Sequence, residues 1–131
     1  MGEPLTRALT RAVRTVTGHV ERVLRPEGLT LDQWLVLAAL AEESDLTMTE
    51  LTARTPASGP TVTRVVDKLV STAAVYREVD PEDRRRVRVH LSPRGRALHK
   101  RLAVRVAEVE RALLGQADAT VLDLLHRLAE S

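Results

Sequence analysis

Apolar residues recur at steps of three and four over residues 4–25, which predicts an amphipathic helix. Pro26 and Gly28 follow this stretch and end the helix. The apolar stripe consists of Leu5, Leu9, Ala12, Val16, Val20 and Val23. The stripe is far along the chain from the other apolar clusters, so we expect it to need a partner surface.

Two capping boxes predict where the next two helices begin. Thr30 is followed three residues later by Gln33, and Thr47 is followed by Glu50, so each pair can satisfy the first backbone amides of a helix. The first of these helices has a wide apolar face, ends near Glu43 and should be mostly buried. The second is short, at about residues 48–54.

The stretch TPASGPTVTRVVDKLV, residues 55–70, predicts a turn followed by another helix. Thr55 precedes a proline and therefore ends the earlier helix, whereas Ser58 suits an N-cap and Pro60 suits the first turn. Val62, Val65, Val66 and Leu69 form the inner stripe. The outer face carries Pro60, Thr63, Arg64 and Asp67, flanked by Thr61 and Lys68. Two helices joined by a short turn, with a polar and basic outer face on the second, are typical of a helix-turn-helix.

Residues 75–79 and 87–91 predict a β-hairpin. Val87, Val89 and Leu91 alternate with Arg88 and His90, which is the period of a strand, and residues 80–83 form a turn. The triplet Arg84, Arg85 and Arg86 then lies at the tip and on the returning strand. A helix-turn-helix followed by a hairpin is a winged helix.

Two more helices complete the chain. Ser92-Pro93 predicts the start of a long helix that runs to about Leu114 and ends at Gly115. A last helix, at about 118–129, carries Val121, Leu122, Leu125 and Leu128.

Composition narrows the class of protein. The 131 residues, 44% hydrophobic and 29% charged, fit one domain, and no apolar run is long enough to span a membrane. No secretory signal is evident, so we expect a cytoplasmic protein. Because cysteine is absent, disulfides and cysteine-based zinc sites are excluded. The net charge is only +2, but residues 84–105 contain nine Arg or Lys and no acid, which is a local footprint for nucleic acid.

The order of elements resembles the MarR family of bacterial transcription regulators over nearly the whole chain. The most specific segments are TVTRVVDKL and DPEDRRRVRVHLSPRGRAL, which look like the recognition helix and the wing signature Asp-x-Arg-Asp-x-Arg of this family. Asp80, Asp83 and Arg85 match that signature, whereas Glu82 replaces its first arginine. Ser92 and Gly95 match the Ser/Thr and Gly positions that come after the second wing strand in the family.

The resemblance implies a mainly α-helical fold with a small β-hairpin wing. One domain, 1–131, would contain a winged helix-turn-helix at 30–91 and dimerisation helices at 4–25 and 92–131. The implied function is a sequence-specific DNA-binding regulator, a homodimeric repressor of a palindromic operator. Its partners would be double-stranded DNA and a second copy of the chain, with no membrane and no cofactor involved.

The resemblance also implies roles for single residues. With the recognition helix in the major groove, Thr63 and Arg64 are candidates for base edges, and Ser58, Thr61 and Lys68 for phosphates. Arg85 would enter the minor groove, while Arg84 and Arg86, alternating to the other side of the hairpin, would meet phosphates. We expect Asp83 to pair with a neighbouring guanidinium and, with Asp80, to shape the wing.

Two departures from the family pattern concern the ends of the recognition helix. It opens with Ser58-Gly59-Pro60, where Gly59 and Pro60 offer no side-chain hydrogen bond to a base. It ends at Ala73-Ala74, where a Gly-Leu pair is usual and a left-handed residue would strain alanine.

Many MarR-type proteins lose DNA affinity when a small anionic aromatic effector binds between the dimer region and the DNA-binding domain. His19, Arg22, Trp34 and His99 are the candidates to line such a pocket here, although Trp34 fits the hydrophobic core better.

Three other functions are alternatives to this one. A winged helix can serve protein–protein contact alone, and salt dependence would discriminate because DNA binding releases counterions. A metal-responsive regulator is a further alternative, but the four histidines show no metal-ligand spacing, so no metal site is predicted. An enzyme is not expected because phosphate loops and nucleophile motifs are absent, and Ser58 and Ser92 are interpreted as helix caps.

Overall fold

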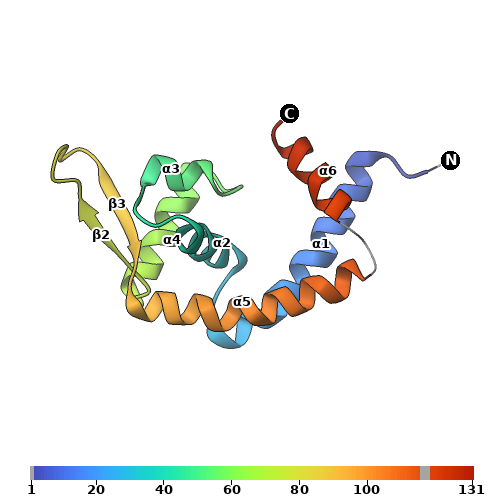
Figure 1. Cartoon of the computed structure of the whole chain (residues 1–131), viewed down its shortest axis with the longest axis horizontal. Helices are drawn as coiled ribbons and strands as arrows, with labels where there is room; N and C mark the ends of the chain where they lie inside the picture. The colour runs from blue at the N-terminus through green and yellow to red at the C-terminus, as the bar shows by residue number, and fades with distance from the viewer. Residues whose placement is uncertain (1, 116–118) are drawn as a thin grey trace.

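The protein is described by a computed structural model that covers residues 2–115 and 119–131. A winged helix-turn-helix lies at one end and the two terminal helices lie at the other, joined by one long helix (Figure 1). The elements in chain order are α1 (Leu5–Leu24), the 3₁₀ turn η1 (Arg25–Glu27), α2 (Leu31–Glu42), β1 (Leu46–Thr47), α3 (Met48–Ala53), α4 (Gly59–Ser71), β2 (Val75–Val79), β3 (Val87–Leu91), α5 (Pro93–Leu114) and α6 (Ala119–Ala129). The predicted start of the last helix at residue 118 lies outside the described residues.

Side-chain caps fix the starts of three helices. Both predicted capping boxes are confirmed: Gln33 N donates to Thr30 Oγ1 at 3.2 Å, and Glu50 N donates to Thr47 Oγ1 at 3.1 Å, each with the reciprocal bond. Ser92 caps α5 by accepting a bond from Gly95 N at 3.0 Å. The predicted N-cap position at Ser58 is confirmed for α4, but its side chain accepts no capping bond. Its hydroxyl donates to Thr61 Oγ1.

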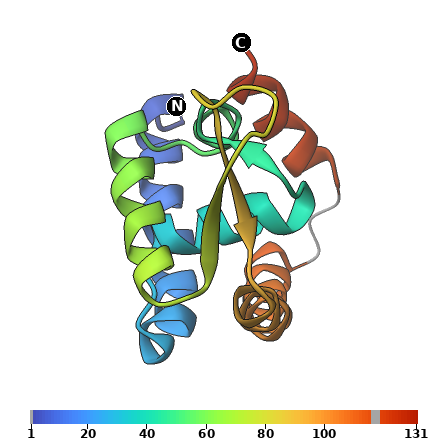
Figure 2. The ribbon, with the colours of Figure 1, turned by 90° about the vertical axis from the view of Figure 1, so that its left-hand side faces the viewer.

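The predicted hairpin is confirmed with the same bounds, and it belongs to a three-stranded antiparallel sheet in the order β1-β3-β2. Val75 pairs with Leu91 and Val79 with Val87, while the two residues of β1 pair with Val89 and Arg88. Figure 2 shows the hairpin crossing in front of the helices. Strand β1, which the sequence analysis missed, ties the wing to the segment before α3.

Two apolar cores hold the chain together. One lies inside the winged helix and includes Val36, Leu51, Val66 and Val89. The other joins α1, α2 and α5, and includes Val20, Leu24, Trp34, Leu102 and Val106. The second half of the α1 stripe thus finds its partner within the chain, on α5, which the sequence analysis did not foresee.

The terminal helices keep apolar side chains exposed. On α1 these are Leu5, Val13 and Val16, and on α6 they are Val121, Leu122, Leu124, Leu125 and Leu128. Among the described residues, no helix has both the length and the apolar character needed to cross a membrane. Apolar side chains gathered on an exposed face are typical of an interaction surface.

Candidate nucleic-acid interface

Helix α4 presents the outer face that the sequence predicts. Val62, Val66 and Leu69 are buried, whereas Thr63, Arg64 and Lys68 are exposed. At its first turn, Ser58 Oγ donates to Thr61 Oγ1 and Arg64 Nη2 donates to the same oxygen, both at 3.2 Å. The half-buried Thr61 hydroxyl therefore joins the helix start to the guanidinium of Arg64 and holds that guanidinium close to the helix.

Two neighbouring grooves lie between α4 and the wing. One shallow groove is lined by Met48, Thr49, Thr52, Ala53, Gly59 and Thr63, between α3 and α4. A second groove is lined by Thr47, Met48, Thr49, Arg85, Arg86 and Val87, between α3 and the wing. Met48 and Thr49 line both, so the start of α3 bridges the recognition helix and the arginines. Thr49 could not be singled out from the sequence, because nothing in its local pattern distinguishes it from a solvated helix residue.

The tip of the wing is a hydrogen-bonded turn. Asp83 Oδ1 accepts bonds from Arg85 N at 3.1 Å and from Arg85 Nε at 3.3 Å, and Arg86 N donates to the Asp83 carbonyl oxygen at 2.9 Å. The expected pairing of Asp83 with a neighbouring guanidinium is confirmed. The Arg85 side chain is 92% exposed despite this contact, so it remains available to a partner.

The predicted division of the arginine triplet is wrong in part. Arg85 and Arg86 both line the groove beside α3, whereas Arg84 lies on another surface with Val79, Asp80 and Pro81. The reason is that β3 begins only at Val87. Residues 84–86 belong to the turn, so the two-residue alternation of a strand does not apply to them.

Asp80 anchors the base of the wing. Its side chain is almost fully buried, its Oδ1 accepts a bond from Glu82 N at 2.9 Å, and its Oδ2 pairs with Arg88. The Glu82 amide, and then the Arg88 guanidinium, hold the pKa of the Asp80 carboxyl below its usual value. Arg88 Nη1 also donates to the carbonyl oxygen of Asp45 at 3.0 Å, so one guanidinium connects the wing with the loop before β1.

A second ion pair connects the recognition helix with the wing. Arg77, on β2, donates to Asp67 Oδ1 on α4. Asp67 lies on the predicted outer face of α4, but its partner could not be predicted from spacing, because the two residues meet only when the hairpin folds back along α4. The pair joins the two candidate DNA-contacting elements directly.

The exit from α4 is tight. Ala73 has φ 63°, the left-handed conformation that the sequence predicted would strain an alanine. The Ser92 hydroxyl donates to the Ala73 carbonyl oxygen at 2.6 Å, and a Cβ on Gly95 would lie 1.9 Å from the Ala74 carbonyl oxygen. Only glycine fits at position 95, and the start of α5 is therefore packed directly on the end of α4.

The four candidate pocket residues are only partly brought together. The rings of Trp34 and His99 stack with centroids 5.0 Å apart, and Trp34 is buried in the second core, as expected. Neither they nor His19 and Arg22 line the pocket of about 380 Å³ that lies between α2, α4 and α5. Within the described residues there is no group of three or more His, Asp or Glu side chains placed to hold a metal.

Comparison with known proteins places the chain in a family. Residues 27–86 match the sequence model described as MarR family. The HTH-type transcriptional regulator YkoM of Bacillus subtilis (strain 168) is 30% identical over 112 residues, which are 85% of this chain and 73% of the relative. The chain belongs to the MarR family. It is a winged helix-turn-helix transcriptional regulator, as the sequence analysis predicted.

Two further relatives extend the MarR-family match over almost the whole chain. The homoprotocatechuate degradative operon repressor of Escherichia coli is 25% identical over 130 residues, 99% of this chain and 88% of the relative. The solved structure of BpsR from Bordetella bronchiseptica has a TM-score of 0.90 at 24% identity and covers 98% of this chain and 95% of that one. The terminal helices, outside residues 27–86, thus share the MarR-family fold as well.

Proposed function

We propose that this MarR-family protein is a homodimeric repressor that binds a palindromic operator. Helix α4 enters the major groove and the wing arginines follow the adjacent minor groove. The observation that carries the proposal is a pair of grooves that share Met48 and Thr49, one lined by Thr63 and the other by Arg85 and Arg86. The recognition helix at one end suits the major groove of DNA, and the narrow basic turn at the other end suits the minor groove.

Arg64 is the residue assigned to base recognition. Its guanidinium is exposed on α4, and its contact with Thr61 limits the directions in which it can point. A guanidinium that reaches guanine with two hydrogen bonds discriminates against other bases by about 1–3 kcal/mol. Thr63 lies beside it on the exposed face, while Ser58, Thr61 and Lys68 contact phosphates and set the register.

Arg85 is the residue assigned to the minor groove. Its side chain is exposed at the turn of the wing, and its backbone amide is held by Asp83. The turn is thus ordered before DNA binds. The Arg85 guanidinium can leave Asp83 and enter the minor groove, where the potential is negative. Arg86, on the same side, contacts the backbone next to α3, and Arg84 contacts the phosphate on the other side of the wing.

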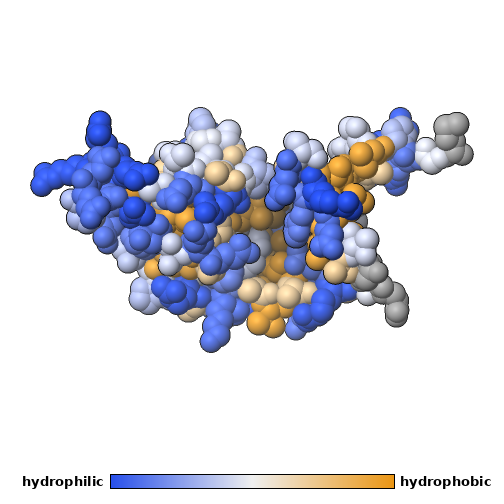
Figure 3. All heavy atoms as spheres, turned by 45° about the horizontal axis from the view of Figure 1, so that its top comes forward, coloured by the Kyte–Doolittle hydropathy of each residue, from blue (hydrophilic) through white to orange (hydrophobic). Residues whose placement is uncertain are grey.

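The second copy of the chain covers the terminal helices. Figure 3 shows apolar surface at the end of the molecule where α1 and α6 lie, and α6 has no buried residue. A two-fold dimer through these helices presents two recognition helices to half-sites about 10 bp apart. Light scattering at micromolar concentration should give the mass of a dimer, and a monomer mass would contradict this arrangement.

The assignment as a repressor is supported by the name of the E. coli relative, a degradative operon repressor. Control by a small molecule is supported by BpsR, whose DNA binding is described as regulated by 6-hydroxynicotinic acid. An effector that enters between the dimer helices and the winged helix would meet the contact of Trp34 with His99, which joins α2 to α5.

Selection of bound DNA from a random pool tests the function in one step. The expected result is a palindromic consensus whose affinity falls steeply as salt rises, because phosphate contacts release counterions. If no sequence is enriched, or if binding does not respond to salt, the DNA-binding function is wrong and the alternative of a protein-interaction module gains support.

A further inference from the structure

Three side chains at the first turn of α4 form a hydrogen-bonded chain. Thr61 Oγ1 accepts one bond from Ser58 Oγ and a second from Arg64 Nη2, both at 3.2 Å. A hydroxyl oxygen has two lone pairs and carries one hydrogen, so both lone pairs of Thr61 are occupied while its own hydrogen is left to be donated. An exposed guanidinium is thus tied to a half-buried hydroxyl three residues before it.

No carboxylate neutralises Arg64 in the part of the chain that the structure describes. Asp67 is the only acid in α4, and its Oδ1 accepts a bond from Arg77 on β2. The ion pairs between described residues do not include Arg64. Its charge therefore stays available to DNA, and the bond to Thr61 sets the direction of its side chain.

The bond to Thr61 leaves Arg64 able to read a base. Of the five N–H groups of an arginine side chain, this bond uses one on Nη2. Nη2 shares one edge of the planar guanidinium with Nε and another edge with Nη1. One complete edge with two donors therefore stays free, whichever hydrogen of Nη2 is used. Two parallel donors match O6 and N7 of guanine in the major groove.

The other residues at the start of α4 offer few donors to a base. Gly59 and Pro60 carry no polar side chain, and a Cβ on Gly59 would meet nothing within 4 Å, so the surface there is open. The Thr63 hydroxyl donates its hydrogen to the Gly59 carbonyl oxygen at 3.1 Å. Donation to bases from this end of the helix is thus concentrated in Arg64.

We propose that Thr61 is a positioning residue for base specificity, acting through Arg64. The inference rests on the proposed function, in which Arg64 reads a base and Thr61 contacts a phosphate. The free hydrogen of Thr61 serves the phosphate while its lone pairs hold the guanidinium. One hydroxyl thereby connects the register on the DNA backbone with the direction of the base-reading arginine, so its loss lowers the preference for guanine as well as the affinity.

Selection from a random DNA pool with the wild type and with Arg64→Ala identifies the guanine concerned. It is the position at which the wild type has a preference and Arg64→Ala has none. The ratio of affinities for the selected operator and for the same operator with adenine at this position then measures base specificity. If no guanine preference depends on Arg64, the assignment of this arginine to a base is wrong and the proposal is overturned.

Two replacements of Thr61 test its role in this ratio. Thr61→Val keeps the branched shape and removes the hydroxyl, and it should lower the preference for guanine about three- to tenfold, the worth of one hydrogen bond. Thr61→Ser keeps a hydroxyl and should retain the preference. A contact to phosphate alone would weaken both operators equally. An unchanged ratio in Thr61→Val therefore overturns the proposal.

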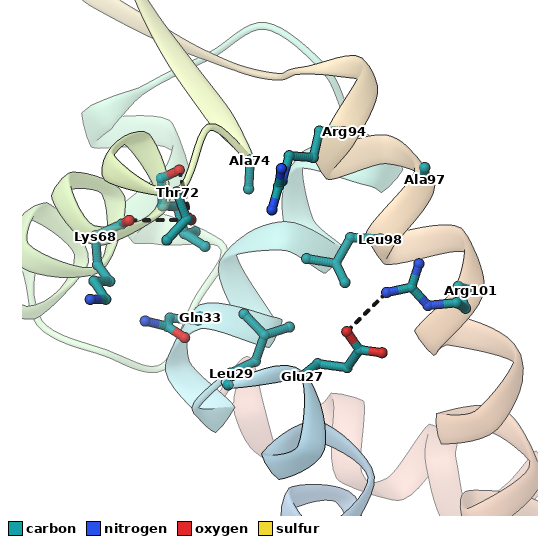
Figure 4. Close-up of a pocket in the computed structure, with 12 residues that line it drawn as sticks. Glu27, Leu29, Gln33, Lys68, Thr72, Ala74, Arg94, Ala97, Leu98 and Arg101 are labelled. Carbon is teal, nitrogen blue, oxygen red and sulfur yellow. Dashed lines mark hydrogen bonds and ion pairs between the residues drawn. The ribbon is translucent and has the colours of Figure 1, made fainter.

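A double-mutant cycle separates an action through Arg64 from a direct contact of Thr61 with the base. In the Arg64→Ala background, Thr61→Val should leave the ratio unchanged, and a persisting effect overturns the positioning role. Thr72→Val is the matched control at the other end of α4, where the Thr72 hydroxyl donates to the carbonyl oxygens of Lys68 and Leu69 (Figure 4). It should not change the ratio, and a loss equal to that in Thr61→Val would reduce the effect to a general perturbation of the helix.

Nuclear magnetic resonance relaxation of arginine Nε–H groups tests the contact without DNA. The Arg64 side chain should be more ordered than that of Arg96, an exposed arginine on α5, and Thr61→Val should remove the difference. Equal mobility of Arg64 in the wild type and in Thr61→Val overturns the proposal even where DNA binding succeeds. If the wild type selects no DNA sequence although Thr61 orders Arg64, the proposed function fails and the role in specificity fails with it. If the wild type selects an operator and Thr61→Val keeps the guanine preference, the role of Thr61 alone fails.

Discussion

Arg88 on β3 holds Asp80 at the base of the wing, with its Nη2 3.2 Å and its Nε 3.3 Å from Asp80 Oδ2. The same guanidinium reaches the carbonyl oxygen of Asp45, a residue with φ 67°. Two segments that are far apart in the sequence are thereby fixed to the strand that leads away from the arginine turn. Asp80 and Arg88 can therefore influence DNA binding through the position of the wing, without touching DNA themselves.

Replacing Arg88 should therefore loosen the wing. Arg88→Met leaves the almost fully buried Asp80 carboxylate without its cation, which is costly in a poorly hydrated site. We expect operator affinity about tenfold weaker in a gel-shift titration, with helical circular dichroism retained. The control is Arg96→Met, which removes the same charge from an exposed position on α5. Equal affinity of the two variants would show that the Arg88 contact does not position the wing.

The minor-groove assignment is tested at the tip. Arg85→Ala should weaken operator binding at least about tenfold, which corresponds to about 1.4 kcal/mol, because an inserted guanidinium is lost. Its fold should be unchanged, since the side chain is exposed. Arg96→Ala matches the change in net charge. Normal affinity of a folded Arg85→Ala protein would remove Arg85 from the interface.

Thr30 and Ser58 both occupy N-cap positions, but only Thr30 makes a capping bond, so their replacement should change the free energy of unfolding by different amounts. Thr30 accepts a bond from the Gln33 amide, so Thr30→Ala should lower the free energy of unfolding by about 1 kcal/mol. Ser58 makes no such bond, and Ser58→Ala should cost less than about half of that. Urea titration at one fixed protein concentration measures both. A larger loss for Ser58→Ala would mean that the Ser58 hydroxyl caps α4 in solution.

Alanine at position 73 stores strain that glycine would release. A left-handed residue costs an L-amino acid with a Cβ about 1–2 kcal/mol, part of which is offset by the greater freedom of glycine in the unfolded chain. Ala73→Gly should therefore raise the melting temperature by a few degrees. Ala97→Gly, inside α5, should lower it, because glycine disfavours a helix. An unchanged or lower melting temperature for Ala73→Gly would show that the turn does not strain Ala73.

His99 should make stability depend on pH. Burial lowers its pKa below the ordinary 6.5, against the opposite influence of Glu42, so the folded protein favours the neutral ring. As pH falls below about 6.5, the unfolded chain binds a proton at His99 more readily than the folded protein does. The free energy of unfolding therefore decreases as pH falls from about 6.5 through the lower pKa of the folded protein. His99→Phe keeps a ring against Trp34 without the titration and should flatten the change in unfolding free energy between pH 7.5 and 5.5. His126→Gln, on the exposed α6, should not, and a slope that persists in His99→Phe would exclude His99 as its source.

Local rules predicted most of the fold because its helix ends depend on neighbouring residues. Thr30 with Gln33, Thr47 with Glu50, and Ser92 followed by Pro93 each fix a helix start within four residues. The period-two run from Val87 to Leu91 likewise gave a strand with the correct bounds. Strand β1 could not be predicted, because two residues are too few to show an alternating pattern. Only their pairing with Val89 and Arg88 defines them as a strand.

The site was predicted less completely because its contacts join distant segments. The exposed faces of α4 and the turn could be derived from spacing, but the Arg77–Asp67 and Arg88–Asp45 contacts arise only when the sheet packs on the helices. The division of the arginine triplet failed for a related reason. A strand rule was applied to residues 84–86, whose geometry is set by hydrogen bonds to Asp83 and Asp80.

Gly95 packs against the Ala74 carbonyl, so the start of α5 is in direct contact with the end of the recognition helix, and a tilt of α5 would pivot at this contact. The 22 residues of α5 span about 33 Å, so a tilt of about 5° moves one end relative to the other by about 3 Å. That displacement is close to the spacing of successive base pairs, about 3.4 Å. Because position 95 has no side chain, a rotation among the terminal helices would pass directly to the end of α4, and under the proposed function it would shift this helix along DNA by about one base-pair step.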